Sequence, residues 1–369
     1  SGNTPTRINK ELFNGTINWI SSGELKEHYI YSTKERISQE AANNLKLLSV
    51  GTFVIAIYGL EAEGVRGTGS ITQEPSTISQ ACMAFTPKGE ITNEFLYSWY
   101  KKHGNVIGVK YAQGTKQQNL SYDILEKFKI SYPNVMEQDK LNLFFSLIDK
   151  RISTQNKIIE DLKKLKYAIS KYLFERKDLF ENKIKLSKVA ELKNGYAFQS
   201  SKYNALGKWK ILTIANVAGE RYVKTNECNC IIEIPYDIQK HQKLEANDIL
   251  ISLTGNIGRV SLCTEGLFLL NQRVGLLQLK VSEDREYIYQ ALSSHKFENS
   301  MTACAQGAAQ MNIGKGDVEN YILPYSFNKE NINSVASVLK NYDKYIINEI
   351  NMLSMLHSQK QYLLRQMFI

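Results

Sequence analysis

The sequence predicts an α+β fold with two tandem mixed α/β domains, each followed by a long helix, and the two helices packed as an antiparallel coiled coil with pseudo-two-fold symmetry. Two observations predict it. A heptad seam occurs once near the middle of the chain, at 136–175, and once at its end, at 330–369. The residue patterns that precede each seam also recur, which indicates an internal duplication.

The residues of the first seam alternate in steps of four and three, as one face of a helix requires: Leu141, Phe145, Ile148, Ile152, Gln155, Ile159 and Leu162. Adding 194 to each number gives the second seam: Val335, Leu339, Tyr342, Ile346, Glu349, Leu353 and Leu356. Each helix would be on the order of 60 Å long. Two such seams in one chain most simply pair with each other. Each contains one polar residue at the same place, so we expect Gln155 and Glu349 to hydrogen-bond across the pair and fix its register.

The pattern Ala-Gln-Gly-x-x-Gln-x-Asn-(Leu/Ile) occupies 112–120 and returns at 305–313. Other segments recur at offsets of 192 to 196, among them 51–59 with 247–255 and 95–97 with 287–289. We therefore predict a first globular domain at 1–135, a helix and linker at 136–185, a second globular domain at 186–328 and a second helix at 329–369. Because Asn194-Gly195 corresponds to Ser1-Gly2, the segment 186–193 has no counterpart in the first unit. Either that unit is trimmed or the end of the second helix supplies its missing edge, and the sequence leaves both open.

Within the first domain, β-branched and aromatic residues predict strands at 17–20, 52–58, 78–85 and 129–133. Helical spacing with aromatic anchors predicts a helix at 93–103. Each domain is thus expected to have a β core and short helices.

Composition is ordinary for a soluble globular protein, with a formal net charge of +9 and a pI of about 9.0 over 369 residues. That charge permits an acidic partner, nucleic acid first. The five cysteines lack structural-zinc spacing and read as reduced thiols of a cytoplasmic protein. No phosphate loop, amino-methyltransferase motif or metal-ligand cluster is present, so we expect no catalytic site, no metal and no cofactor in this chain. No signal peptide and no stretch long enough to cross a membrane is expected either.

Glutamine and asparagine can pair with adenine in the major groove, which gives the shared motif, with Gln117 and Gln310, a DNA-reading interpretation. The alternative is that Asn119 and Asn312 satisfy turn backbone. Because both halves share the motif, we favour a structural or phosphate-contacting role. Polar loop residues that differ between the halves are better candidates for DNA contact: Arg7, Lys26, Lys34, Arg36, Arg66 and Lys116 in the first half, and Tyr203, Arg221, Tyr222, Lys224, Asn256 and Arg259 in the second.

The order domain–helix–domain–helix, together with Ser1-Gly-Asn-Thr-Pro5, Asp248-Ile-Leu-Ile-Ser252, Gly255-Asn-Ile-Gly-Arg-Val260 and the Ala305 motif, resembles a type I restriction-modification specificity (S) subunit over nearly the whole chain. The resemblance implies two target-recognition domains, each reading one half of a split site in double-stranded DNA. It implies that the paired helices set the gap and dock methyltransferase (M) subunits, two of them. S-adenosylmethionine would belong to M, and ATP with Mg²⁺ to the restriction (R) subunits. The S subunit would have no catalytic activity of its own.

Three alternatives stand beside this interpretation. The recognition subunit of a type IIB-like system is barely separable from it by sequence. A coiled-coil scaffold for protein partners would bind no DNA. A catalytic DNA methyltransferase would need a methyl-donor pocket and its acidic/Pro-Pro motif, which are absent.

Overall fold

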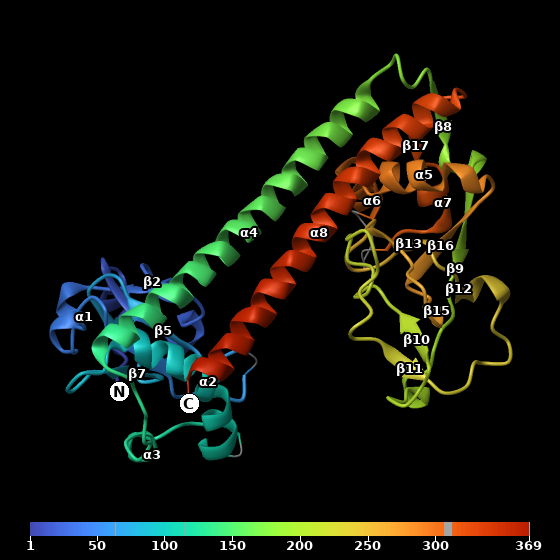
Figure 1. The fold of residues 1–369 in the computed structure, drawn as a ribbon. Coiled ribbons are helices and arrows are strands. Elements are labelled where there is room, and N and C mark those ends of the chain that lie inside the picture. The colour runs from blue at the N-terminus through green and yellow to red at the C-terminus, as the bar shows by residue number, and fades with distance from the viewer. Residues whose placement is uncertain (63, 115, 306–311, 369) are drawn as a thin grey trace. The chain divides into compact units, whose positions relative to one another are not determined.

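A computed structural model describes residues 1–62, 64–114, 116–305 and 312–368, the side chain of Glu283 excepted (Figure 1). The chain divides into two compact units. Unit 1 comprises Ser1–Asn156 with Met352–Ile369, and unit 2 comprises Lys157–Asn351. Each long helix therefore contributes one part to each unit.

The described part of the first half of the chain contains short strands and three helices before the first long helix: β1 Ile17–Ile20, β2 Tyr29–Ile30, β3 Arg36–Ile37, α1 Gln39–Asn43, β4 Phe53–Ala56, β5 Gly69–Thr72, β6 Ser76–Ile78, β7 Cys82–Phe85, α2 Asn93–Tyr111, α3 Tyr122–Leu125 and α4 Val135–Glu175. Single 3₁₀ turns lie at η1 Lys10–Phe13 and η2 Ser22–Glu24.

The second half of the chain repeats this plan with a few additions: β8 Asn182–Lys185, β9 Ala190–Asn194, β10 Trp209–Leu212, β11 Asn229–Ile231, β12 Lys243–Leu244, β13 Ile249–Ser252, β14 Val260–Leu262, β15 Phe268–Leu270, β16 Val274–Leu279, α5 Arg285–Leu292, α6 His295–Ala305, α7 Lys315–Glu319, β17 Ile322–Tyr325 and α8 Lys329–Met367. Its 3₁₀ turns are η3 Leu186–Lys188, η4 Ser200–Lys202, η5 Lys240–Gln242 and η6 Ser282–Asp284.

Sheet topology confirms the duplication. In unit 1, β1 pairs antiparallel with β3 and parallel with β6, and β10 of unit 2 does the same with β11 and β15. The second sheet has β4 antiparallel between β5 and β7, and β13 antiparallel between β14 and β16. In unit 2, β9 adds to the edge of β16, and β8 pairs with β17.

The core of unit 1 joins its larger sheet to the helices. The strand β4 is buried along its whole length, as expected for a central strand covered on both faces. The helix α2 packs against β4 and β5. It begins at Asn93, and the hydroxyl of the preceding Thr92 caps it by accepting a hydrogen bond from Phe95 N at 3.2 Å. The same core takes in Phe145 of α4 and Phe368 near the end of α8.

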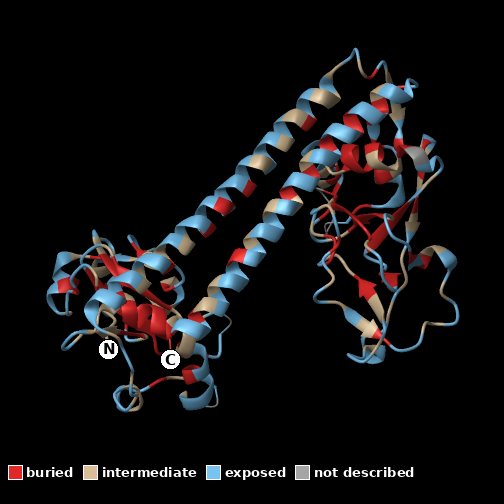
Figure 2. Ribbon diagram, in the orientation of Figure 1, coloured by how far each residue is buried: buried red, intermediate tan, exposed pale blue. Residues whose placement is uncertain are grey.

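The core of unit 2 is built in the same way, from the other parts of the long helices. Buried residues of β13, α5 and α6 pack with Ile332, Val335 and Leu339 at the start of α8 and with Leu173 and Phe174 at the end of α4. Figure 2 shows this burial in the strands and in α5. In unit 1 the start of α4 thus meets the end of α8, and in unit 2 the end of α4 meets the start of α8, which is the antiparallel order.

The fourteen predicted seam residues are all buried or half-buried. Five of the buried ones are Phe145, Ile152, Ile159, Leu339 and Ile346, each at most 8% exposed. This periodic burial is what the alternation of four and three requires. A hydrogen bond between Gln155 and Glu349 stays a prediction.

Two of the strand predictions are wrong: one predicted strand is two separate strands, and the other is not a strand. The segment 78–85 is two strands, because β6 pairs with β1 while β7 pairs with β4, and the chain turns at Ser79–Ala81 to pass from one sheet to the other. The segment 129–133 forms no strand. Its repeat counterpart β17 is a strand because it pairs with β8, and the described part of unit 1 offers Lys129–Pro133 no such partner.

Candidate nucleic-acid interface

Four of the basic residues predicted to contact DNA gather on one part of unit 1. The guanidinium of Arg7 donates two hydrogen bonds of 2.9 Å to the Glu35 carboxylate, and Lys34 N donates to Glu24 Oε1 at 2.7 Å. These contacts join the segments that carry the four residues. We define the basic face as Arg7, Lys26, Lys34 and Arg36, all of which are exposed.

Glu35 offsets one of the four positive charges of this basic face. The hydrogen bond from Arg7 lowers the pKa of the Glu35 carboxyl. The Arg7 guanidinium also lies 4.9 Å from the Phe13 ring centroid and 5.5 Å from that of Trp19, which orients it on the surface. The lysines and Arg36 have no ion pair among those found in the described residues, so phosphate groups could reach them directly.

Arg66 holds a loop rather than projecting from one. Its Nη2 donates to Gln118 Oε1 at 2.6 Å, and its stem crosses α2 at Gly108, where an added Cβ would lie 2.5 Å from Arg66 Cγ. The loop itself presents Lys116 and Gln117, both exposed, to solvent. Arg66 therefore positions a loop that carries two further candidates for DNA contact.

The shared Ala-Gln-Gly motif has a backbone function where it is described. Gln113 N and Asn119 N each donate to the other residue's carbonyl, at 2.8 and 2.9 Å, and Leu120 N donates to Ile57 O at 2.9 Å. In unit 2 the matching bond runs from Ile313 N to Leu253 O at 3.0 Å. These contacts favour the structural interpretation of the motif. Gln310 lies outside the described residues.

The candidates of unit 2 are more dispersed. Asn256 is exposed on the turn between β13 and β14, where Gly255 and Gly258 take φ of +69° and +74°. Arg259 is 37% exposed at its side chain and pairs with Glu298 at 3.5 Å. Tyr203 is half-buried against an apolar cluster that includes Ile211. Tyr222 and Lys224 are exposed, with Lys224 Nζ 3.2 Å from Glu220.

Arg221 is enclosed inside unit 2. Its side chain is 7% exposed and donates to Glu286 at 2.8 and 2.6 Å and to Asp343 Oδ2 at 2.9 Å. Burial by itself would lower the pKa of the Arg221 guanidinium. The hydrogen bonds to Glu286 and the attraction of both carboxylates outweigh this effect, so the pKa of Arg221 is raised. We therefore leave Arg221 out of the DNA interface that we propose.

The long helices carry a further set of exposed side chains that the seam analysis missed. On α8, Val338, Tyr345 and Met352 are 43%, 62% and 42% exposed and lie seven residues apart. On α4, Leu143 and Leu147 are 61% and 56% exposed. The signal was present in the sequence as a second heptad-spaced apolar register beside the seam. Exposed apolar residues repeated along one face of a helix are candidates for an interaction surface.

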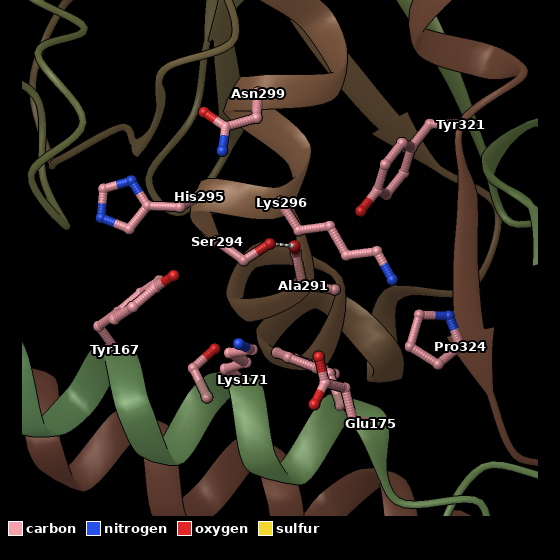
Figure 3. A pocket seen from close by; sticks show the side chains of 12 residues that line it. Tyr167, Lys171, Glu175, Ala291, Ser294, His295, Lys296, Asn299, Tyr321 and Pro324 are labelled. Carbon is pink, nitrogen blue, oxygen red and sulfur yellow. Dashed lines mark hydrogen bonds between the residues drawn. The ribbon is translucent and has the colours of Figure 1, made fainter.

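A cavity of about 280 Å³ lies in unit 2 between α4 and the pair α5–α6 (Figure 3). Tyr167 and Lys171 face it from α4, and His295 from α6. In the repeat, Ala291 on its wall corresponds to Trp99 of α2, whose side chain is buried in the core of unit 1. The cavity therefore lies where unit 2 has the methyl group of Ala291 and unit 1 has the indole ring of Trp99. Among the described residues, no group of three or more His, Cys, Asp or Glu side chains could hold a metal ion.

The family model described as "Type I restriction modification DNA specificity domain" matches residues 1–164 and again residues 180–352. The chain belongs to the type I restriction-modification DNA specificity family. The two matches correspond to the two copies of the repeated fold. The chain is a type I restriction-modification specificity subunit with two target-recognition domains.

Curated members of this specificity family resemble the chain over part of its length. The MjaIX specificity subunit of Methanocaldococcus jannaschii is 27% identical over 187 residues, 49% of this chain and 42% of that protein. The EcoR124I/EcoR124II specificity subunit of Escherichia coli is 27% identical over 185 residues, 48% and 45% of the two chains. The chain thus spans less than half the length of these two relatives.

Solved structures of specificity subunits share the fold. The S subunit from M. genitalium superposes with a TM-score of 0.57 at 16% identity, covering 100% of this chain and 92% of that one. A chain from a study titled "Structural basis underlying complex assembly and conformational transition of the type I R-M system" gives 0.59 at 15% identity, covering 95% and 90%. No helix among the described residues is long and apolar enough to cross a membrane.

Proposed function

We propose that each recognition domain of this specificity subunit reads one half of a bipartite, asymmetric site in double-stranded DNA. The observation that carries the proposal is the repeat itself: one sheet topology occurs twice in the chain, while the polar loop residues differ between the copies. A shared frame with different loops is what two domains need to read two different sequences.

DNA attraction in unit 1 would come from the basic face and from Lys116 on its loop. The net charge of +9 supports binding to a polyanion. Phosphate contacts would position the domain, and the residues that read bases would be polar side chains of the loops. In unit 2, exposed Lys224 and Asn256 are the corresponding candidates.

The paired helices would set the unread gap and dock M subunits, two of them. Successive major-groove faces on one side of a duplex lie about 34–36 Å apart, and a helix of 41 residues is about 60 Å long, long enough to connect domains across such a gap. The exposed apolar register of α8 supports a protein partner on these helices. The chain would act without catalysis of its own in the cytoplasm, M would bind S-adenosylmethionine, and R subunits would join through the complex with ATP and Mg²⁺.

The test is a selection from random-sequence duplexes, with and without the M subunits, at low and high salt. A split motif with a fixed gap and an affinity that falls steeply with salt supports the proposal. A coiled-coil scaffold for proteins gives no enrichment under any of these conditions, and that result overturns DNA reading.

Docking of M subunits has its own test at Tyr345. Truncating an anchoring aromatic of an interface commonly costs 2 kcal/mol or more, so Tyr345→Ala should weaken M binding by at least about tenfold. The control is Lys344→Ala, the neighbouring exposed residue on α8. Equal affinity of both variants, measured by calorimetry with isolated M, would exclude this face of α8 from the interface.

A further inference from the structure

The charges that surround Arg221 come from three elements of unit 2. Glu286 lies on α5 of the recognition domain, and Asp343 lies on α8. Lys166 of α4 donates to the other oxygen of Asp343 at 2.6 Å. The enclosed Arg221 thus joins the domain to α8, and Asp343 extends the connection to α4 through Lys166.

Aromatic rings complete this arrangement. The Arg221 guanidinium carbon lies 5.6 Å from the Tyr222 ring centroid and 5.1 Å from that of Tyr289, which is 1% exposed. Gln290 also donates to Asp343 Oδ2 at 2.6 Å. The guanidinium is therefore held by directional hydrogen bonds to two carboxylates and lies near two aromatic rings.

Unit 1 contains the same arrangement around a histidine. His28 Nε2 lies 2.8 Å from Glu94 Oε2 on α2, and its Nδ1 lies 3.8 Å from Asp149 Oδ2 on α4. Lys360 of α8 forms an ion pair with the other oxygen of Asp149. The imidazole is stacked between two tyrosine rings, those of Tyr29 and Tyr97, with both centroids at 4.0 Å.

Six members of one cluster have counterparts in the other, 192 to 194 residues away. His28 matches Arg221, Glu94 matches Glu286, Asp149 matches Asp343, Lys360 matches Lys166, and the two tyrosines match Tyr222 and Tyr289. The backbones agree as well. Ile71 N donates to His28 O at 2.8 Å, and Leu262 N donates to Arg221 O at 2.7 Å. The two long helices exchange roles between the clusters, as pseudo-two-fold symmetry requires.

We propose that His28 and Arg221 are positioning residues that fix the orientation of each recognition domain on the helix pair, and thereby the gap between the half-sites. We call each cluster a clasp: His28, Glu94, Asp149 and Lys360 in unit 1, and Arg221, Glu286, Asp343 and Lys166 in unit 2. The inference rests on the proposed reading of a split site. Apolar contacts alone are non-directional, whereas a buried ion pair demands a defined geometry and is costly to break.

The geometry of DNA makes such orientation matter. A duplex advances about 3.4 Å and turns about 35° with each base pair, since one turn takes 10–10.5 base pairs. A gap changed by one base pair therefore asks the two domains to rotate relative to each other as well as to separate. A domain held by its clasp resists that rotation, and a domain released from it accommodates several gaps.

The experiment compares gap selectivity in the complete complex with M subunits. Duplexes carry the selected half-sites at the selected gap or at a gap longer or shorter by one base pair. For Arg221→Gln and for Asp343→Asn, the preference for the selected gap should fall at least about tenfold, equivalent to about 1.4 kcal/mol. The bases preferred within each half-site should stay unchanged. Arg221→Lys, which retains the cation, should retain more of the preference than Arg221→Gln.

A matched control distinguishes the loss of clasp contacts from a general loss of stability in the domain. Val217→Ala alters a fully buried residue in an apolar cluster of unit 2 to which the clasp does not belong. This variant should lose affinity equally at every gap while its gap preference persists. In unit 1, His28→Gln should relax the gap and His28→Arg should preserve it, because the arginine reproduces the clasp of unit 2.

Two results would overturn the inference in different ways. In the first, the wild-type complex prefers one gap and Arg221→Gln and Asp343→Asn show the same preference. This result rejects the role of the clasp and leaves the proposed reading of a split site intact. A wild-type complex that selects no split motif removes the proposed function, and the clasp with it.

Discussion

Truncation of Phe145 tests whether the long helices are part of the core of unit 1. The ring is 3% exposed and lies 5.6 Å from that of Phe368, which directly follows α8 and in turn lies 5.2 Å from Phe95 on α2. Replacing a core phenylalanine by alanine costs about 3–5 kcal/mol. Domains have total stabilities of about 5–15 kcal/mol, so Phe145→Ala should remove a large part of the stability of unit 1.

The neighbouring Phe144 is the matched control, because it has the same chemistry, lies on the same helix and is 39% exposed. Phe144→Ala should cost about 1 kcal/mol. The contact between the two rings, at 5.5 Å, is lost in both variants and cancels in the comparison. Both are measured by urea denaturation in a Trp209→Phe background, where Trp19 and Trp99 report on unit 1. Equal losses for the two variants would refute the packing of α4 and α8 into this core.

Three other predictions concern charge and protonation. Lys34→Gln on the basic face should lower the slope of log binding constant against log salt by about 1, and an unchanged slope places Lys34 outside the interface. Burial raises the pKa of Cys82 to about 12, so this thiol should resist iodoacetamide at pH 8 in the native protein while exposed Cys304 reacts, and mass spectrometry showing the reverse order contradicts the burial of Cys82. Burial also raises the pKa of Asp248 above its unfolded value, so the stability that this group contributes is complete below about pH 3.9 and is lost as pH rises through the folded pKa. In urea titrations, Asp248→Asn should therefore gain stability relative to wild type between pH 4 and pH 7. A difference between the two proteins that does not change with pH contradicts this prediction.

The repeated architecture could be predicted because duplication leaves its record in the residues. The seam spacing located α4 and α8 to within two residues at each end. The helix at 93–103 begins where predicted but continues to Tyr111 as α2. The added part contains Gly104 and Gly108. They are where Gly67 and Arg66 approach the helix too closely for a side chain.

Strand pairing was harder to predict because it depends on segments distant in sequence. The segment 78–85 has continuous strand-like composition, yet only its partners β1 and β4 decide that it divides between two sheets. The segment 129–133 has the same propensity as β17 and lacks the pairing partner that makes β17 a strand. Propensity is local, whereas a sheet is completed by distant neighbours.

The site residues show the same limit. Arg7, Lys26, Lys34 and Arg36 were predicted from composition, and only the structure shows that contacts join their segments. Arg221 has the composition of a DNA contact but is enclosed by Glu286 and Asp343. Matching the two halves residue by residue would have pointed to a structural role for these carboxylates, since Asp149 and Asp343 occupy corresponding positions of the two long helices.

The most direct test of split-site reading exchanges one domain. Residues 1–133 are replaced by the corresponding domain of another specificity subunit, and the complex with M subunits is selected against random duplexes. Independent reading predicts that one half-site changes while the other half-site and the gap are retained. A motif that changes in both halves, or that is lost altogether while the chimaera still binds M, would contradict the assignment of one half-site to each domain.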